Sequence, residues 1–205
     1  MENLINIFIR ATFIDNMIFA YFLGMCSYLA VSKTVKTSFG LGVAVAFVLV
    51  ITVPINYLIN TYLLSPGALA WLFDGGSTID LGYLSFIVFI AVVAAVVQLL
   101  EMIVEKFAPA LYNQLGIFLP LIAVNCAIMG ASLFMQEREY AGVAEAFSFA
   151  LGSGAGWLLA IVGIAAIRER VTYANIPAPL RGAGITFILT GLMAISFMSF
   201  LGISL

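Results

Sequence analysis

Six long intervals without a charged side chain dominate this sequence of 205 residues. They lie between Asp15 and Lys33, Lys36 and Asp74, Asp80 and Glu101, Lys106 and Glu137, Glu145 and Arg168, and after Arg181. Each is 17 to 37 residues long, and a helix needs about 20 apolar residues to cross the hydrocarbon core of a bilayer. Only 9% of the residues are charged, against about 25% in soluble domains. The sequence therefore predicts an integral membrane protein.

One transmembrane helix is expected in each interval, which makes the fold all-α. The six spans are expected at about 11–32, 39–63, 81–104, 115–135, 146–167 and 182–203. Helices are favoured because lipid offers no water to backbone groups, and the alternation of a barrel strand is absent. The longest interval holds a single helix, because the run Leu64-Ser65-Pro66-Gly67 breaks it. A loop or re-entrant turn is expected from there to Asp80.

The positive charges predict the orientation of these spans. With six spans, the loops after the first, third and fifth share one side of the membrane. That side holds Lys33, Lys36, Lys106, Arg168, Arg170 and Arg181, and the other side holds only Arg10 and Arg138. Because Lys and Arg are enriched in cytoplasmic loops, both termini are expected outside the cytoplasm, in the periplasm of a bacterium.

The order of the spans predicts an inverted repeat within a single membrane domain. Repeat one covers about 1–106 and repeat two about 107–205, with three spans each. Since three is odd, the second repeat enters the membrane from the opposite side. Folds of this kind place their sites near the midplane, where interrupted helices of the two repeats meet. The first helix of each repeat is expected to be broken at its cysteine, which would bring Cys26 and Cys126 together.

These two cysteines are the only thiols, and the chain has no histidine. Each cysteine could simply be a small apolar residue at a helix interface, a common role for buried free Cys. The alternative is thiolate ligation of zinc, copper(I) or an iron–sulfur cluster. Two thiolates complete neither a tetrahedral site nor a [2Fe–2S] cluster. If Cys26 and Cys126 bind metal, the remaining ligands must come from another chain, which a partner of the same fold would supply.

Other polar residues allow weaker inferences. Glu101, near the end of the third span, is either an interfacial acid paired with Lys106 or part of a cation path, because acids at membrane depth are often functional. Asp15 and Asn16 are expected to cap the first helix. The glycine-rich run 152–156 is expected to pack helices closely rather than bind phosphate. A net charge of −2 gives no sign of a nucleic-acid partner.

Several stretches resemble the family of membrane proteins that contains the D and E subunits of the bacterial sodium-translocating NADH:quinone oxidoreductase and the A and E subunits of the Rnf complex. They lie at 22–26, 30–33, 36–42, 111–113, 115–122, 124–128, 166–169 and 191–193. The stretches Phe-Leu-Gly-Met-Cys at 22–26 and Val-Asn-Cys-Ala-Ile at 124–128 are the most specific. Met25 and the runs beginning at Ser32 and Val53 are closer to the quinone-reductase subunits than to Rnf. The loops 64–80 and 136–145 match less well.

The resemblance implies a function in electron transfer. It implies that Cys26 and Cys126 bind half of a [2Fe–2S] cluster, which the paralogous D subunit completes with two cysteines of its own. The cluster would relay electrons across the bacterial inner membrane between carriers on its two sides. Flavins and the NADH site would lie on the A, B, C and F subunits, since this chain has no G-x-G-x-x-G fingerprint. The whole complex would reduce ubiquinone and export Na⁺.

Three alternatives stay open at the level of sequence. The chain is alternatively the A subunit of the Rnf ferredoxin:NAD⁺ oxidoreductase, a metal-free cation carrier built from inverted repeats, or a scaffold of a membrane complex. Iron in the purified protein separates the electron relay from the carrier and the scaffold. Membrane lipid is a partner in every case.

Overall fold

The computed structural model describes residues 2–65, 82–107 and 119–202, and all regular structure within them is helical. This agrees with the all-α prediction. The α-helices are α1 (Glu2–Ile9), α2 (Met25–Val31), α3 (Val35–Ile59), α4 (Ser85–Phe107), α6 (Leu119–Ala123), α7 (Cys126–Glu137), α8 (Val143–Val171) and α9 (Ala183–Met198). Single π-helical segments extend α1 through Arg10–Ile14 and α3 through Asn60–Leu64. Short 3₁₀ turns cover Gly82–Leu84, Ala178–Leu180 and Ser199–Gly202.

Three helical stretches of the described residues are long and apolar enough to cross a membrane, namely Val35–Leu64, Gly82–Phe107 and Val143–Val171. They correspond to the spans expected at 39–63, 81–104 and 146–167. Shorter apolar helices cover Asn3–Ile14, Leu121–Glu137 and Ala183–Met198, within or beside the other three expected spans. The chain is thus a membrane protein, and the division into six spans and two inverted repeats stays a prediction. The expected loop from 64 to 80 lies largely outside the described residues.

The first expected span, 11–32, is interrupted over 15–24, which lies before Cys26 and not at it. A helix begins earlier, at Glu2, and ends at Ile14, and α2 begins only at Met25. Asn16 explains the interruption, because its Oδ1 accepts hydrogen bonds from the backbone N–H groups of Ile18 (3.0 Å) and Phe19 (3.4 Å). Such local bonds compete with helix propagation. Asn16 thus forms the hydrogen bonds expected of a capping residue, but to the turn at 17–21 and not to a long first helix. Asp15 forms no such bond with the described residues and instead ends the π-helical segment Arg10–Ile14.

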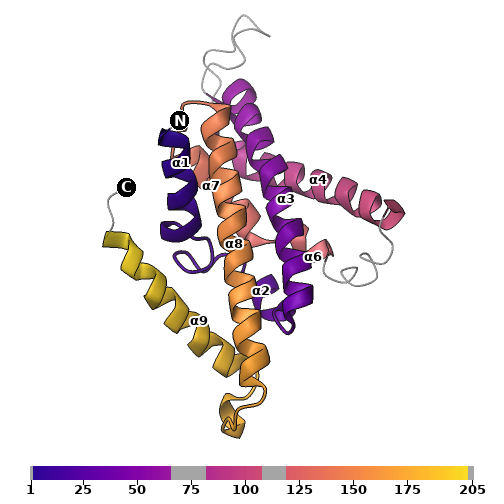
Figure 1. Ribbon diagram of the computed structural model, residues 1–205. Helices are drawn as coiled ribbons and strands as arrows, with labels where there is room; N and C mark the ends of the chain where they lie inside the picture. Colours follow the sequence, from indigo (N-terminus) through magenta and orange to yellow (C-terminus); the bar gives the residue numbers. More distant parts are fainter. Residues whose placement is uncertain (1, 66–81, 108–118, 203–205) are drawn as a thin grey trace, which may run out of the picture.

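Helix α8 forms the axis of the fold, with α1 and α3 on either side of it (Figure 1). Glycines of the run 152–156 permit this close packing, as expected from the sequence. A Cβ built on Gly154 would lie 2.9 Å from the Cα of Ala46 in α3, and one on Gly152 would lie 2.6 Å from the carbonyl oxygen of Phe8 in α1. Small residues allow helix backbones to approach closely in membranes. The run is a helix-packing surface within α8.

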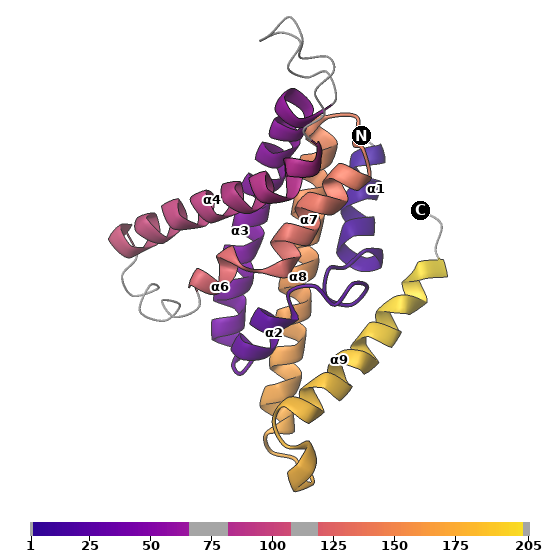
Figure 2. The same cartoon turned by 180° about the vertical axis from the view of Figure 1, so that it is seen from behind.

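Two helices extend away from this bundle. Figure 2 shows α4 running outwards on one side and α9 on the other. Only Ser85, Phe89, Val93 and Val97 of α4 are buried. Helix α9 likewise exposes most of its apolar side chains. These surfaces are available to lipid or to another membrane protein.

Candidate metal centre

Cys26 is the second residue of α2, and a left-handed residue precedes the helix. Gly24 precedes the helix with φ +81° and ψ +15°, a conformation that glycine adopts at no steric cost. The side chain of Cys26 is free and exposed in the single chain. The local sequence therefore places this thiol at a helix start on the protein surface.

Cys126 is the first residue of α7. The short helix α6 ends at Ala123, and Asn125 then caps α7 by accepting a hydrogen bond from the N–H of Ala127 at 3.0 Å. Asn is among the most favourable residues for this position. Like Cys26, Cys126 is free and exposed. Both candidate ligands thus stand at the beginning of a helix that follows an interruption.

The structure brings the two cysteine-bearing segments into contact. A Cβ built on Gly24 would lie 2.8 Å from Oδ1 of Asn125 and 3.0 Å from the Cβ of Ala127. The backbone two residues before Cys26 therefore packs against the residues on both sides of Cys126. The side chain of Leu23 also packs against α7, at Gly130. Residues from opposite halves of the chain thus pack together here.

Two buried N–H donors without a partner lie beside this contact. Nδ2 of Asn125 and Nε1 of Trp157 form no hydrogen bond with any described residue. Nε1 of Trp157 would be 2.8 Å from a Cβ on Gly24, and both side chains are almost fully buried. Unpaired buried donors are destabilising by about 1–3 kcal/mol each. Groups of this kind are typical of a site that is completed by a ligand, an ion or water.

The donor set fits half of a cluster site. Within the described residues, no three His, Cys, Asp or Glu side chains gather closely enough to hold a metal. The sequence contains no further cysteine and no histidine, so this chain offers two soft thiolate ligands and no more. A [2Fe–2S] cluster takes four ligands, normally thiolates. The residues present are consistent with a cluster that a second chain completes.

An apolar groove of about 590 Å³ adjoins Cys126. Ile90 and Val93 of α4 form one wall, Met129 and Leu133 of α7 form another, and Glu137 lies at its edge. This arrangement places Cys126, one of the lining residues, beside a largely apolar surface. The groove is a surface where a partner chain could approach the thiol.

Comparison with known proteins bears on what this site serves. Residues 4–204 match the model of a family described as "Rnf-Nqr subunit, membrane protein". The chain belongs to the Rnf-Nqr family. It is 59% identical to proteins of Idiomarina loihiensis and Psychromonas ingrahamii over 205 residues and 53% identical to one of Rhodopirellula baltica over 213, with full coverage of both chains in each case. All three relatives are named as the E subunit of the Na(+)-translocating NADH-quinone reductase. The family resemblance inferred from the cysteine stretches is thereby confirmed.

Glu101 does not line the groove beside Cys126 in this member of the Rnf-Nqr family. It is partly exposed in the second half of α4. Its carboxylate forms no ion pair or hydrogen bond with any described residue, so the expected pairing with Lys106 is not observed. A role of Glu101 in a cation path stays a prediction.

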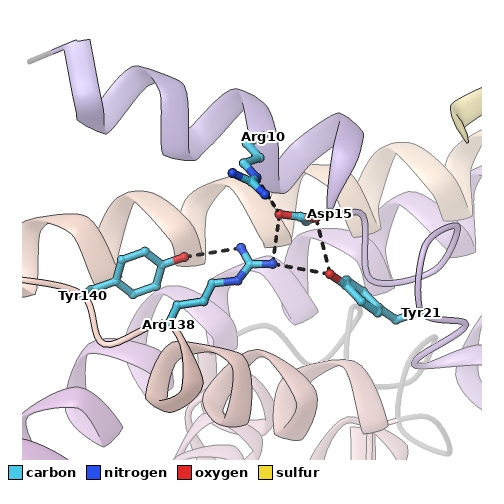
Figure 3. Close-up of polar contacts among 5 residues, drawn as sticks. All are labelled: Arg10, Asp15, Tyr21, Arg138 and Tyr140. Carbon is cyan, nitrogen blue, oxygen red and sulfur yellow. Dashed lines mark hydrogen bonds and ion pairs between the residues drawn. The ribbon is translucent and has the colours of Figure 1, made fainter. Parts of the chain in front are cut away.

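A cluster of ion pairs, which sequence reasoning missed, joins the end of the first helical segment to the end of α7 (Figure 3). The carboxylate of Asp15 is 3.1 Å from Nε of Arg10 and 2.9 Å from Nη2 of Arg138. Tyr21 donates to Asp15 at 3.4 Å, and Arg138 donates to Tyr140 at 3.5 Å. Burial lowers the pKa of Arg138, but the hydrogen bond to Tyr140 and the charge of Asp15 outweigh it, so the pKa is raised. Arg138 therefore stays charged.

A signal for this cluster was present in the sequence. Arg10 and Arg138 are the only cations expected on their side of the membrane, and Asp15 lies close to Arg10 along the chain. An acid near membrane depth requires a counter-charge, and these two arginines were the available ones.

Proposed function

We propose that this chain is the E subunit of a Na⁺-translocating NADH-quinone reductase, and that Cys26 and Cys126 hold half of an intramembrane [2Fe–2S] cluster. The observation that supports the proposal is the buried contact between Gly24 and Asn125, which joins the two cysteine-bearing segments, together with the exposure of both thiols. The names of full-length relatives at 53–59% identity support the same assignment. The paralogous D subunit supplies the other two thiolates.

The residues of this chain act by binding and by electrostatics. When bound, the cluster supplies a one-electron carrier between donors and acceptors on opposite sides of the membrane. Cys26 and Cys126 bind as thiolates, and the backbone N–H groups at the start of α7 favour their negative charge. The unpaired donors of Asn125 and Trp157 add positive dipoles next to the same segments. Hydrogen bonds near cluster sulfurs are one of the ways in which proteins set a cluster potential.

The wider assembly follows from the same proposal. The chain spans the bacterial inner membrane six times as two inverted repeats, each opening with a helix that is interrupted before its cysteine, and both termini lie in the periplasm. NADH and the flavins belong to the A, B, C and F subunits. Electron transfer through the shared cluster is coupled to Na⁺ export, and the groove next to Cys126 receives part of the D subunit.

Iron analysis of the purified complex tests the proposal. The variants Cys26→Ala and Cys126→Ala are each expected to lose the iron and acid-labile sulfide of one [2Fe–2S] cluster, together with its electron paramagnetic resonance signal. Quinone reduction should stop, while NADH oxidation by artificial acceptors continues. Met25→Leu is the matched control, because it removes a neighbouring sulfur while leaving both thiols, and it should retain the iron.

Two outcomes would contradict the assignment of the ligands. Unchanged iron in both cysteine variants would exclude these residues as ligands. A full [2Fe–2S] spectrum from the isolated chain would exclude the shared site. Ferredoxin-dependent NAD⁺ reduction by the native complex, in place of quinone reduction, would assign the chain to the Rnf branch of the family.

A further inference from the structure

A second cavity, of about 320 Å³, lies where α8 ends and α9 begins. This end of the molecule is the lowest part in Figure 1. Three cations from separate parts of the chain line the cavity: Lys33 from the turn between α2 and α3, Arg168 from the end of α8, and Arg181 from just before α9. None of its lining residues is acidic. We refer to this cavity as the basic pocket.

The charges of the basic pocket are not neutralised within the described residues. The ammonium group of Lys33 and the guanidinium group of Arg181 form no hydrogen bond or ion pair with them, and both side chains are exposed. The carboxylate of Glu169 accepts the N–H of Val35 at 2.8 Å at the start of α3 and does not line the pocket, although its charge lies next to Arg168 in the chain. Three like charges around one cavity repel each other unless an anion is bound.

Arg168 is held in place for such an anion. One of its amino groups, Nη1, donates to the carbonyl oxygen of Leu29 at 3.1 Å and to Oγ of Ser32 at 2.6 Å. Its other amino group, Nη2, forms no hydrogen bond with a described residue. A guanidinium that is already ordered loses little entropy when it binds, and its planar fork suits phosphate oxygens. Arg168 therefore presents a positioned phosphate donor.

The remainder of the basic pocket is lined by small and apolar residues and by two threonines, Thr172 and Thr186, and the pocket adjoins the exposed apolar face of α9. Val171, Ile176 and Ile185 line its other side. Beyond Ile185, the outer face of α9 continues with exposed apolar side chains, including Phe187 at 54% and Leu192 at 56% exposure. A small anion or an acidic peptide would gain no stabilising contact from such an apolar surface, whereas the acyl chains of a lipid would. Helix α8 is long and apolar enough to span the membrane and ends at Val171, so the pocket lies at the level where headgroups meet acyl chains.

We propose that the basic pocket binds the phosphodiester headgroup of an anionic phospholipid, with the acyl chains lying along the outer face of α9. The site is independent of the metal centre. Basic pockets between transmembrane helices bind anionic headgroups on the cytoplasmic side of membranes. Helices α8 and α9 diverge upwards from this end of the molecule (Figure 2), which leaves the outer face of α9 accessible to acyl chains.

Native mass spectrometry of the full chain in detergent, titrated with phosphatidylglycerol, tests this proposal. Phosphatidylglycerol is expected to bind more tightly than phosphatidylcholine. Lys33→Gln and Arg181→Gln should each weaken its binding about fivefold, the effect of one interfacial cation. Lys36→Gln and Arg170→Gln are matched controls, because they remove the same charge from the same end of the molecule outside the basic pocket. Both controls should stay within about twofold of the native chain, since surface charges outside a binding pocket contribute little to affinity.

Charge-conserving variants separate electrostatics from folding. Lys33→Arg and Arg181→Lys should retain binding of phosphatidylglycerol. Equal weakening in all four glutamine variants would overturn the proposal in favour of a diffuse positive surface. Competition by millimolar inorganic phosphate would show an anion site without lipid specificity. Shielding of Lys33 and Arg181 from lipid by another protein of the purified complex would assign the pocket to a protein interface.

Discussion

Replacing Gly24 with alanine tests whether the contact between the two cysteine-bearing segments positions the metal centre. Gly24 has φ +81°. A residue with a Cβ is destabilised by about 1–2 kcal/mol in this left-handed conformation. The added Cβ would also lie 2.8 Å from both Oδ1 of Asn125 and Nε1 of Trp157. Overpacking of a tight core typically destabilises by about 1–3 kcal/mol. We therefore expect Gly24→Ala to lower the free energy of unfolding by about 2–5 kcal/mol.

The neighbours of Gly24 have little freedom to relieve this overlap. Trp157 is fully buried in α8, and Asn125 is fixed by its capping bond to α7. The segment before Cys26 must therefore move away from α7, which separates the two thiols from their native arrangement. In the proposed complex, Gly24→Ala should consequently lower the iron content although both cysteines are present.

Denaturant titration of the full chain in detergent measures the stability change, and iron analysis of the complex measures the second effect. Gly191→Ala is the control, because a Cβ at Gly191 in α9 meets no atom within 4 Å and the backbone is helical. It should not destabilise the protein. A Gly24→Ala variant with the stability and iron content of the native protein would refute the inferred role of this contact.

Three further predictions concern the rest of the chain. Asp15→Asn should lower the free energy of unfolding by about 1–3 kcal/mol, because it leaves the half-buried Arg138 without its anion. The control Glu139→Gln, which changes an exposed acid nearby, should alter the free energy of unfolding by less than ~0.5 kcal/mol. Equal effects of the two variants would argue against a stabilising role of the cluster. Asn16→Ala should lower the free energy of unfolding by about 2–4 kcal/mol in the denaturant titration, since buried backbone groups lose their hydrogen-bond partners. Thr34→Ala, at an exposed residue, should have little effect. Reporters fused to either terminus should both respond in the periplasm, and reporters on opposite sides would exclude an even number of spans.

The spacing of charged residues was sufficient to locate the long helices. The spans expected at 39–63, 81–104 and 146–167 overlap helices α3, α4 and α8 almost completely. Burial in lipid requires uninterrupted apolar segments of fixed minimum length, so this information is local and readable. The helical role of the glycine run 152–156 was readable for the same reason, since small residues in an apolar helix permit close packing.

The interruption before Cys26 was harder to define from sequence. Its limits depend on the side chain of Asn16, which donates to the carbonyl oxygens of Thr12 and of Gly156 in α8. Without α8, the same residue would simply be a polar group in an apolar stretch. The cluster around Asp15 was missed for a similar reason, because Arg138 comes from a distant part of the chain.

The sequence by itself determined that this chain is a helical membrane protein with two thiols and no other soft ligand, because composition, charge spacing and cysteine number do not depend on folding. The tertiary structure decided which surfaces these residues share. Only packing places Gly24 against Asn125, and thereby one cysteine segment against the other. Only packing gathers Lys33, Arg168 and Arg181 around one pocket. Such contacts join residues that are far apart in the chain, and their energies depend on distances that no local pattern encodes.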